Sequence, residues 1–181
     1  HEIAGVVVEL GPDARNINVG DRVCSTQREY VCGCCTMCRS DRETLCPDLR
    51  FLGQDALGGY AEFVAVMDDN LVRLPDNVSF ETGSIVACAV GTSFNAVCDT
   101  GRVKPGERVL ITGMGGLGIH AVQIARAAGA FVIAATRSAA KAKLIEEMGA
   151  NRVVVAADGR FAGGVREATD GRGVDIAIDT V

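Results

Sequence analysis

The chain has 181 residues, enough to bury a substantial core in one or two domains. An apolar content of 48% excludes a disordered chain, and few aromatic residues with 22 Gly suit an Ala/Val/Gly-rich α/β protein. The net charge of −5 comes from interspersed acids and bases, which argues against a nucleic-acid binder. No apolar run is long enough for a membrane span. Without a secretory signal, eight Cys favour metal or redox chemistry over disulfides.

The first half of the chain, from His1 to about Val90, has the pattern of strands and loops. A β-branched run over Ile3–Leu10 is closed by Gly-Pro, and a turn leads into a second strand at Arg22–Cys24. Residues Tyr60–Val66 alternate in polarity after two glycines, and Asn70–Leu74 follows them. These segments predict a barrel-like domain.

From Ser79 onward the periodicity becomes helical. Ser79 is a good N-cap with Glu81 in the first turn, and Thr92–Thr100 indicates a second helix. Strands then alternate with helices, which predicts a parallel doubly wound sheet. The expected strands are 108–112, 131–135, 153–155 and 174–178; the expected helices are 116–128, a helix capped by Ser138 and running through Met148, and 162–168.

Four cysteines lie within fifteen positions at a C-x2-C-x2-C-x7-C spacing: Cys32, Cys35, Cys38 and Cys46. Two-residue spacers let a tight loop direct successive thiolates at one centre, so the spacing predicts a closed four-thiolate zinc site. Such a site leaves no position for substrate, and its role would be structural. Disulfides or unused thiols are the alternatives. Cys34 lies inside the cluster but outside the spacing, and we interpret it as a spectator that could replace a ligand or become oxidised.

A glycine-rich motif directly follows the strand predicted at 108–112 and leads into a helix. It reads G-x-G-x-x-G over Gly113, Met114, Gly115, Gly116, Leu117 and Gly118. In this context the first glycine permits a tight turn, the second lets the backbone approach a pyrophosphate, and the third allows close helix–strand packing. The motif predicts a dinucleotide site; the alternative is a glycine-rich turn that binds nothing.

The end of the next strand predicts which dinucleotide is bound. An acidic residue there would accept hydrogen bonds from the ribose hydroxyls and repel a 2′-phosphate, but this chain has Thr136, Arg137 and Ser138. The two hydroxyls can donate to phosphate oxygens, and the guanidinium can pair with a phosphate or stack on adenine. NADP(H) is therefore favoured over NAD(H), unless Arg137 is only a solvated residue at a helix start.

Together these motifs resemble the zinc-dependent alcohol dehydrogenases of the medium-chain dehydrogenase/reductase superfamily. The likeness includes His1-Glu2-x-x-Gly5, the turn Gly20–Val23, the segment Gly58–Glu62, and Cys88-x3-Thr92. The resemblance implies a GroES-like β-barrel portion over residues 1–95, with a four-cysteine zinc lobe at 32–46. It implies that residues 96–181 form the first part of a Rossmann domain with a doubly wound parallel sheet.

The resemblance also implies a second, catalytic zinc. It places a zinc ligand at His1 with the nearby acid Glu2, the second thiolate ligand at Cys88, and a pocket residue at Thr92. The family's first cysteine ligand would precede residue 1, and its chains are about twice as long, so we expect the sequence to be an internal part of a longer enzyme. The alternatives are a chance or tag-derived His1 and a buried structural Cys88.

Enzymes of this family transfer hydride between an alcohol and the nicotinamide ring, with an aldehyde or ketone as the oxidised partner. The resemblance implies a cytoplasmic homo-oligomer, dimer or tetramer, with no nucleic-acid or membrane partner. One alternative is a zinc-independent quinone or enoyl reductase of the same superfamily. Another is a non-catalytic, NADP(H)-binding redox sensor.

Overall fold

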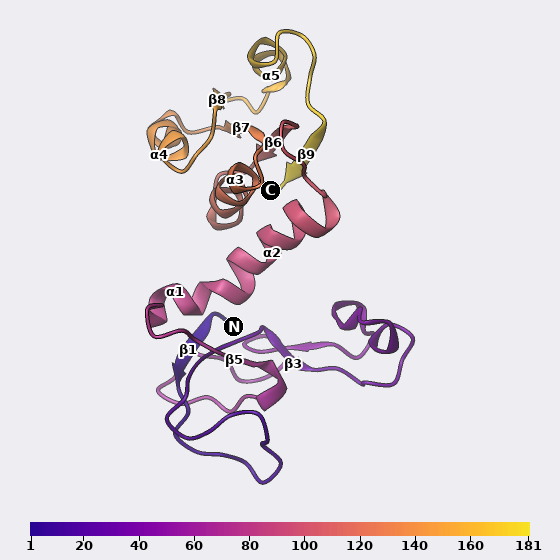
Figure 1. Ribbon diagram of the computed structural model, residues 1–181, viewed down its shortest axis with the longest axis vertical. Coiled ribbons are helices and arrows are strands. Elements are labelled where there is room, and N and C mark those ends of the chain that lie inside the picture. The colour runs from indigo at the N-terminus through magenta and orange to yellow at the C-terminus, as the bar shows by residue number, and fades with distance from the viewer. The chain divides into compact units, whose positions relative to one another are not determined.

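A computed structural model describes residues 1–181, and the chain divides into two compact units, His1–Cys88 and Ala89–Val181 (Figure 1). We call them the β unit and the nucleotide unit. No helix in either has both the length and the apolar composition needed to cross a membrane.

Two small antiparallel sheets form the framework of the β unit. The first has the order β1-β2-β5 and the second pairs β3 with β4. Helix α1 packs against β1 and β2. The elements are β1 (Ile3–Val6), β2 (Arg22–Ser25), β3 (Arg28–Tyr30), η1 (Cys38–Ser40), η2 (Glu43–Leu45), β4 (Arg50–Phe51), η3 (Asp68–Asn70), β5 (Leu71–Arg73) and α1 (Phe80–Ile85).

Two strand expectations need correction. The strand expected over Ile3–Leu10 ends at Val6, and the alternating segment Tyr60–Val66 forms no strand. Alternation gives a segment two faces, but a strand also needs a neighbouring backbone for its N–H and C=O groups, and no ladder forms along 60–66. Phe63 is accordingly 73% exposed.

The interior of the β unit is small and its connections are largely polar. Its core cluster consists of Val7, Ile17 and Val23, with Leu71 against it. Arg22 donates hydrogen bonds to the carbonyls of Pro75 and Val78, and its guanidinium lies 4.6 Å from the centre of the Phe80 ring. Ser79 caps α1 as expected, since its side chain accepts a hydrogen bond from the N–H of Thr82.

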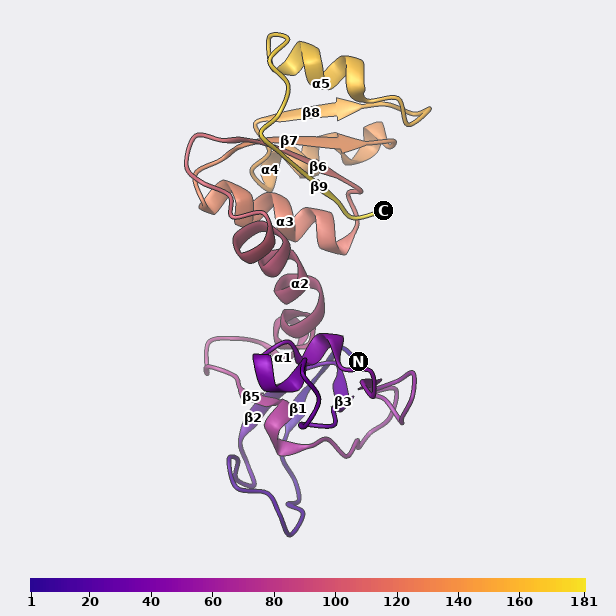
Figure 2. The ribbon, with the colours of Figure 1, turned by 90° about the vertical axis from the view of Figure 1, so that its right-hand side faces the viewer.

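A four-stranded parallel sheet with the order β8-β7-β6-β9 forms the centre of the nucleotide unit. Helices cover both faces of this sheet (Figure 2), which confirms the expected doubly wound α/β arrangement. The chain reaches it through η4 (Val86–Val90), α2 (Gly91–Phe94) and η5 (Asn95–Thr100). The other elements are β6 (Arg108–Thr112), α3 (Gly116–Ala127), β7 (Phe131–Thr136), η6 (Ala139–Lys141), α4 (Ala142–Glu147), β8 (Arg152–Val155), α5 (Ala162–Ala168) and β9 (Ile176–Asp179).

Apolar side chains fill the space on both faces of this sheet. Twelve buried residues, including Ile111, Val122 and Ile145, form the cluster that packs against α3 and α4. A second cluster of Leu110, Ile133, Ala135 and Val165 packs against α5. The nearly continuous apolar character of β6 and β7 follows from burial on both faces.

Ser138 lies at the expected N-cap position, but it precedes a 3-10 turn and does not cap with its side chain. The segment after β7 starts with the 3-10 turn η6, in which the N–H of Lys141 bonds to the backbone carbonyl of Ser138. No side-chain cap bond forms, and the N–H of Ser138 itself donates to the hydroxyl of Thr136. In a 3-10 turn the backbone carbonyl of residue i accepts the N–H of residue i+3, so the N–H of Lys141 is already hydrogen-bonded and does not need the Ser138 hydroxyl.

Candidate zinc and dinucleotide sites

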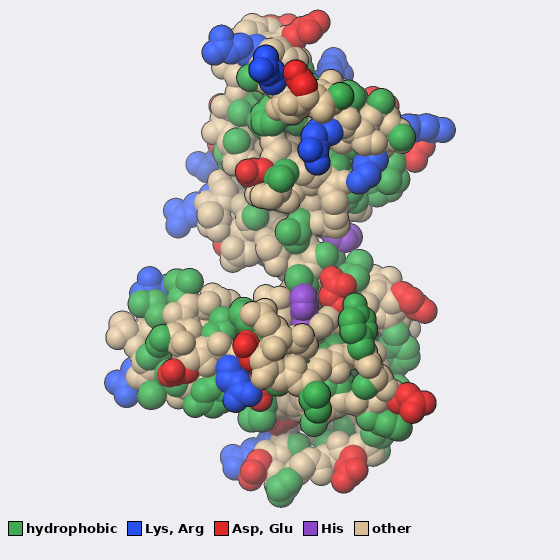
Figure 3. Space-filling view, turned by 180° about the vertical axis from the view of Figure 1, so that it is seen from behind, with side chains coloured by type: hydrophobic (Ala, Val, Ile, Leu, Met, Phe, Trp, Pro, Cys, Tyr) green, Lys and Arg blue, Asp and Glu red, His purple; other side chains and the backbone are tan.

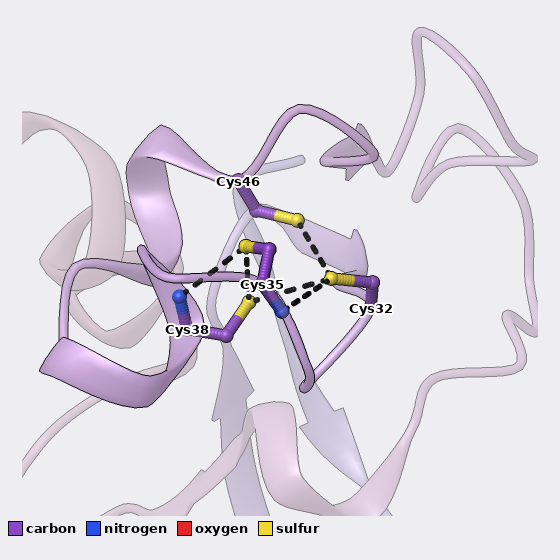
Figure 4. A group of neighbouring side chains, drawn as sticks. All are labelled: Cys32, Cys35, Cys38 and Cys46. Carbon is purple, nitrogen blue, oxygen red and sulfur yellow. Dashed lines mark hydrogen bonds between the residues drawn. The ribbon is translucent and has the colours of Figure 1, made fainter.

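The structure brings the sulfurs of Cys32, Cys35, Cys38 and Cys46 together, within 4.8 Å of one another (Figure 4). All four thiols are free of disulfide bonds. Cys32 and Cys35 lie in the loop after β3, Cys38 begins η1, and Cys46 directly follows η2. No other group of three or more potential metal ligands gathers in the chain.

The spacing of the sulfurs fits a tetrahedral zinc ion. With a Zn–S bond of about 2.3 Å, tetrahedral geometry places the sulfurs about 3.8 Å apart. Three of the six sulfur–sulfur distances are 3.5 Å between Cys35 and Cys38, 3.6 Å between Cys46 and Cys32, and 3.9 Å between Cys32 and Cys38, and all six are within 4.8 Å. The donor set is therefore the right chemistry at the right separation, and four thiolates leave no open position for a substrate.

Without a metal, the thiolate form is stabilised at one cysteine of the cluster and destabilised at another. Backbone N–H groups of Cys34 and Cys35 donate to the Cys32 sulfur and lower its pKa to about 6. Burial, followed by hydrogen bonds with Cys35 and Cys46, raises the pKa of Cys38 to about 12. A metal that binds here must therefore displace the proton of Cys38.

The segment 32–46, here called the cysteine lobe, has no apolar interior of its own. Its only buried side chains are Cys38 and Cys46, and Leu45 is 62% exposed. An ion pair between Arg28 and Glu43 joins the lobe to β3, and Arg28 also donates to Asn70 across 2.8 Å. Sequence reasoning missed this link, because nothing in the local pattern relates Arg28 to residues fifteen and more positions away.

The expected catalytic residues His1, Glu2 and Cys88 belong to the β unit, and Thr92 lies in α2 of the nucleotide unit. Burial raises the pKa of the Cys88 thiol; the Glu2 carboxylate raises it further, and the N-terminal ammonium of His1 lowers it. The charges of the first two residues therefore influence Cys88, but the three side chains do not gather into a group that could hold one metal ion. His1 and Glu2 are exposed, and Cys88 is half-buried.

The glycine motif forms a tight turn between β6 and α3. Gly113 has a φ of +80°, and its carbonyl accepts hydrogen bonds from the N–H of Gly115 at 2.9 Å and the hydroxyl of Thr180 at 2.7 Å. A Cβ at Gly118 would lie 2.0 Å from the Gly113 carbonyl oxygen, whereas one at Gly115 or Gly116 would meet nothing within 4 Å. Gly118 is required for packing, and Gly115 and Gly116 leave open space where a ligand can approach.

The position of this turn suits a dinucleotide. Strand β6 lies between β7 and β9, so the glycine turn sits at the carboxyl end of the sheet where the strand order reverses. This switch point is where open parallel sheets bind ligands, and α3 directs the free N–H groups of its first turn there. The buried side chain of Met114 anchors the turn, and Lys141 donates from Nζ to the Met114 carbonyl across 2.9 Å. Sequence reasoning missed Lys141.

The three residues expected to select the dinucleotide have different surroundings. Thr136 is buried and its hydroxyl accepts the N–H of Ser138 at 3.2 Å, which leaves the hydroxyl hydrogen to donate. Ser138 is half-buried, and Arg137 is exposed and forms no ion pair. Only Arg137 therefore presents a free charge.

Comparison with known proteins agrees with this combination of fold and sites. Residues 1–76 match the alcohol dehydrogenase GroES-like domain, and residues 116–181 match the zinc-binding dehydrogenase family. The chain is 43% identical over 154 residues to an alcohol dehydrogenase of Geobacillus stearothermophilus, covering 85% of this chain and 45% of that protein.

Two solved structures are also similar. An NAD-dependent alcohol dehydrogenase is 33% identical, with a TM-score of 0.91 over 98% of this chain and 52% of its own. A zinc-binding dehydrogenase from Sinorhizobium meliloti 1021, bound to NADP, is 34% identical, with a TM-score of 0.88 over 100% of this chain and 53% of its own.

The α/β fold and the matched segments are those of the zinc-binding dehydrogenase class. The chain belongs to the zinc-dependent alcohol dehydrogenase family of the medium-chain dehydrogenase/reductase superfamily. It spans about half the length of the curated relatives that it matches.

Proposed function

We propose that the protein containing this chain is a cytoplasmic, homo-oligomeric oxidoreductase that transfers hydride between NADP(H) or NAD(H) and a small alcohol, aldehyde or ketone. Cys32, Cys35, Cys38 and Cys46 hold a structural zinc. His1 and Cys88 are ligands of a catalytic zinc, with Glu2 beside them and Thr92 as a pocket residue. The six residues Gly113–Gly118 hold the pyrophosphate.

The observation that carries this proposal is the sulfur geometry of the cysteine lobe. The four free thiols lie within 4.8 Å of one another, with three pairs at 3.5 to 3.9 Å, which matches a four-thiolate zinc site, and the lobe contains no other buried side chains that would hold it together. A zinc-independent reductase or a nucleotide sensor has no need of such a site.

The catalytic zinc proposed for the β unit depends on an imidazole and a thiolate, two groups that can bind the same zinc ion. The catalytic zinc, when bound, acts as a Lewis acid toward the substrate oxygen. The imidazole of His1 and the thiolate of Cys88 would hold it, and the proton must leave Cys88, whose pKa is raised by burial. The carboxylate of Glu2 lies close enough to influence the charge of that thiol.

The cofactor preference proposed for the nucleotide unit is NADP(H), on the strength of Arg137. No carboxylate pairs with its guanidinium, so it is free to meet a 2′-phosphate, with the hydroxyls of Thr136 and Ser138 beside it in the sequence. One of the similar structures is bound to NADP and another is of an NAD-dependent enzyme, so both dinucleotides occur among the relatives.

The test is to titrate NADPH and NADH against this chain by fluorescence, and to measure reduction of aldehydes and ketones by a protein of the relatives' full length that carries it. We expect NADPH to bind more tightly and Arg137→Ala to weaken NADPH binding about ten-fold or more, with little effect on NADH. Lys143→Ala, which removes an exposed lysine paired with Glu147, is the control. A strong preference for NADH would reject the assignment of Arg137.

A further inference from the structure

A side chain at the end of β9 is bound to the glycine turn, and the proposed function does not use it. Strands β6 and β9 are parallel neighbours in which Thr112 pairs with Asp179, so the residues after β9 lie beside the turn between β6 and α3 (Figure 2). Thr180, the first residue after β9, is half-buried. Its hydroxyl oxygen lies 2.7 Å from the carbonyl oxygen of Gly113 and 2.8 Å from that of Thr112.

The Thr180 hydroxyl has one hydrogen, and the Gly113 carbonyl is the acceptor that depends on it more. The carbonyl of Thr112 also accepts the backbone N–H of Thr180, at 3.3 Å. The hydroxyl of Thr112 donates to the carboxylate of Asp179 and is not available to its neighbour. The two lone pairs of the Gly113 carbonyl therefore meet the N–H of Gly115 and the hydroxyl of Thr180.

The Gly113 carbonyl is enclosed by protein on two sides. A Cβ on Gly113 would lie 2.7 Å from the Thr180 hydroxyl oxygen and 2.9 Å from Cγ2 of Val181, which shows how closely the end of β9 packs against this residue. On the other side, a Cβ on Gly118 would lie 2.0 Å from the carbonyl oxygen. The oxygen therefore points into the protein, between the end of β9 and the first turn of α3.

The direction of this carbonyl also sets the direction of a free N–H group. The chain contains no cis peptide bond, and in a trans peptide the C=O and N–H groups point to opposite sides. The N–H of Met114 belongs to the same peptide unit as the Gly113 carbonyl, so it points away from the end of β9, and no backbone carbonyl accepts a hydrogen bond from it. A free N–H beside the start of a helix is a donor that suits a phosphate oxygen.

We propose that Thr180 is a positioning residue of the dinucleotide site, which holds the Gly113–Met114 peptide with its carbonyl away from the pyrophosphate and its N–H toward it. This inference rests on the proposed function, in which Gly113–Gly118 hold the pyrophosphate. Gly113 has a φ of +80° and no side chain of its own to fix the peptide that follows it. If that peptide turned over, a carbonyl oxygen would face the phosphates and repel them. A donor that is already oriented before the ligand arrives removes part of the cost of binding.

The experiment compares two substitutions of this threonine. Thr180→Val keeps the branched shape and loses the hydroxyl, whereas Thr180→Ser keeps the hydroxyl and loses the methyl group. Thr100→Val is the matched control, because Thr100 is an exposed threonine of the same unit whose hydroxyl donates to the Asn95 side chain. NADPH and NADH are titrated against each chain by fluorescence, and thermal unfolding is followed in parallel.

Both dinucleotides carry the pyrophosphate, so the loss should not depend on which one is bound. We expect Thr180→Val to weaken the binding of NADPH and NADH alike by about five- to ten-fold, the value of one hydrogen bond. Thr180→Ser and Thr100→Val should bind both within about two-fold of the unsubstituted chain. This pattern differs from that of Arg137→Ala, which should affect NADPH alone.

The amide resonance of Met114 distinguishes positioning from a general loss of stability. In an isotope-labelled chain at saturating NADPH, a new hydrogen bond should shift the Met114 amide proton to lower field in the unsubstituted chain and in Thr180→Ser. The shift should be absent in Thr180→Val, even though the site is filled. A role of Thr180 in folding alone would leave this shift unchanged.

The outcomes separate this inference from the function on which it rests. A chain that binds neither dinucleotide contradicts the proposed function; the carbonyl carbon resonance of Gly113, which should move in Thr180→Val and not in Thr180→Ser, then tests whether the hydroxyl fixes this peptide. Unchanged binding or an unchanged Met114 shift in Thr180→Val overturns the inference and leaves the glycine turn as the proposed site. Equal losses in Thr180→Val and Thr180→Ser also overturn it, because the hydroxyl would then not be the cause.

Discussion

The two units of the chain are stabilised by different means. The nucleotide unit buries twelve apolar residues on one face of its sheet and four on the other, whereas the core cluster of the β unit has three. In the space-filling view (Figure 3), hydrophobic side chains reach the surface of the β unit. Val6, Val8 and Phe63 are among the exposed apolar residues of this unit. A unit with so little apolar interior depends on its polar links and on the cysteine cluster for which we propose a zinc, and a unit with a large interior does not.

The two units also differ in net charge. Residues 1–88 carry seven basic and fourteen acidic side chains, for a net charge of −7, whereas residues 89–181 carry eleven basic and nine acidic ones, for a net charge of +2. The chain's overall charge of −5 conceals this asymmetry. The positive unit is the one whose glycine turn suits the phosphates of a dinucleotide, which is the sign that attracts such a ligand.

Removal of zinc should show the largest difference in stability between the two units. Structural zinc contributes roughly 10 kcal/mol or more in small zinc-dependent domains, so a strong chelator should disorder the cysteine lobe and leave the sheet of the nucleotide unit unchanged. Limited trypsin digestion should then cut after the exposed Arg39 and Arg42, while hydrogen exchange in β6 and β7 stays slow. Equal loss of protection in both units would contradict the comparison.

Truncation of a core side chain should instead destabilise the nucleotide unit and leave the β unit unchanged. Ile145→Ala removes a side chain that is 0% exposed in the larger core, and it should lower the free energy of unfolding of the nucleotide unit by about 2–5 kcal/mol. The adjacent Leu144, at 47% exposed, is the control, and Leu144→Ala should change that free energy by no more than about 0.5 kcal/mol. Thermal unfolding followed by circular dichroism measures both, and neither variant should change the zinc content.

Three alanine substitutions in the glycine turn should show which glycines are needed for packing of the protein and which are needed for binding of the dinucleotide. Gly118→Ala places a Cβ 2.0 Å from the Gly113 carbonyl oxygen and should cost about 1–3 kcal/mol of stability as well as dinucleotide binding. Gly115→Ala meets no protein atom within 4 Å, so it should keep stability and lose binding if the pyrophosphate approaches there. Gly116→Ala, equally unobstructed, should behave in the same way if the pyrophosphate also approaches there. NADPH binding that survives Gly115→Ala unchanged would reject the role of that residue.

The pH dependence of zinc affinity should reflect the proton that Cys38 holds in the metal-free lobe. The pKa of Cys38 is raised to about 12, so at neutral pH the metal-free lobe holds this proton and zinc must displace it. Affinity should therefore rise about ten-fold for each pH unit from this one group, equivalent to about 1.4 kcal/mol. Cys32, with a pKa lowered to about 6, is largely ionised at neutral pH and adds to the dependence only as pH falls toward and below 6. Competition with a chelator from pH 6 to 9 measures it, and a flat profile would contradict the assignment.

Local sequence patterns were sufficient to predict most strands and helices of the nucleotide unit, because each of these elements depends mainly on residues that are near one another in the sequence. The strand Arg108–Thr112, the glycine turn and α3 follow one another within twenty residues, and the clusters on both faces of the sheet account for the apolar runs. The four clustered cysteines were likewise readable from spacing alone, because short spacers restrict where the sulfurs can lie.

What sequence reasoning missed depends on partners that are distant in the chain or on local bonding choices. Tyr60–Val66 alternates like a strand but has no ladder neighbour. Arg28 joins Glu43 and Asn70, and Lys141 reaches the Met114 carbonyl, and no local pattern indicates such pairs. Ser138 has the residue type of a cap, yet the 3-10 turn satisfies its first donor with a backbone carbonyl.

We propose that four sulfurs of the β unit hold one zinc, which stabilises a cysteine lobe that has no apolar interior of its own. X-ray absorption at the zinc edge, on Cys88→Ala chain purified with its metal, tests this most directly because that variant leaves the cysteine lobe as the only complete site. The account predicts one zinc per chain surrounded by four sulfurs at about 2.3 Å. A zinc bound mainly by nitrogen or oxygen, or a folded β unit with no metal at all, would contradict it.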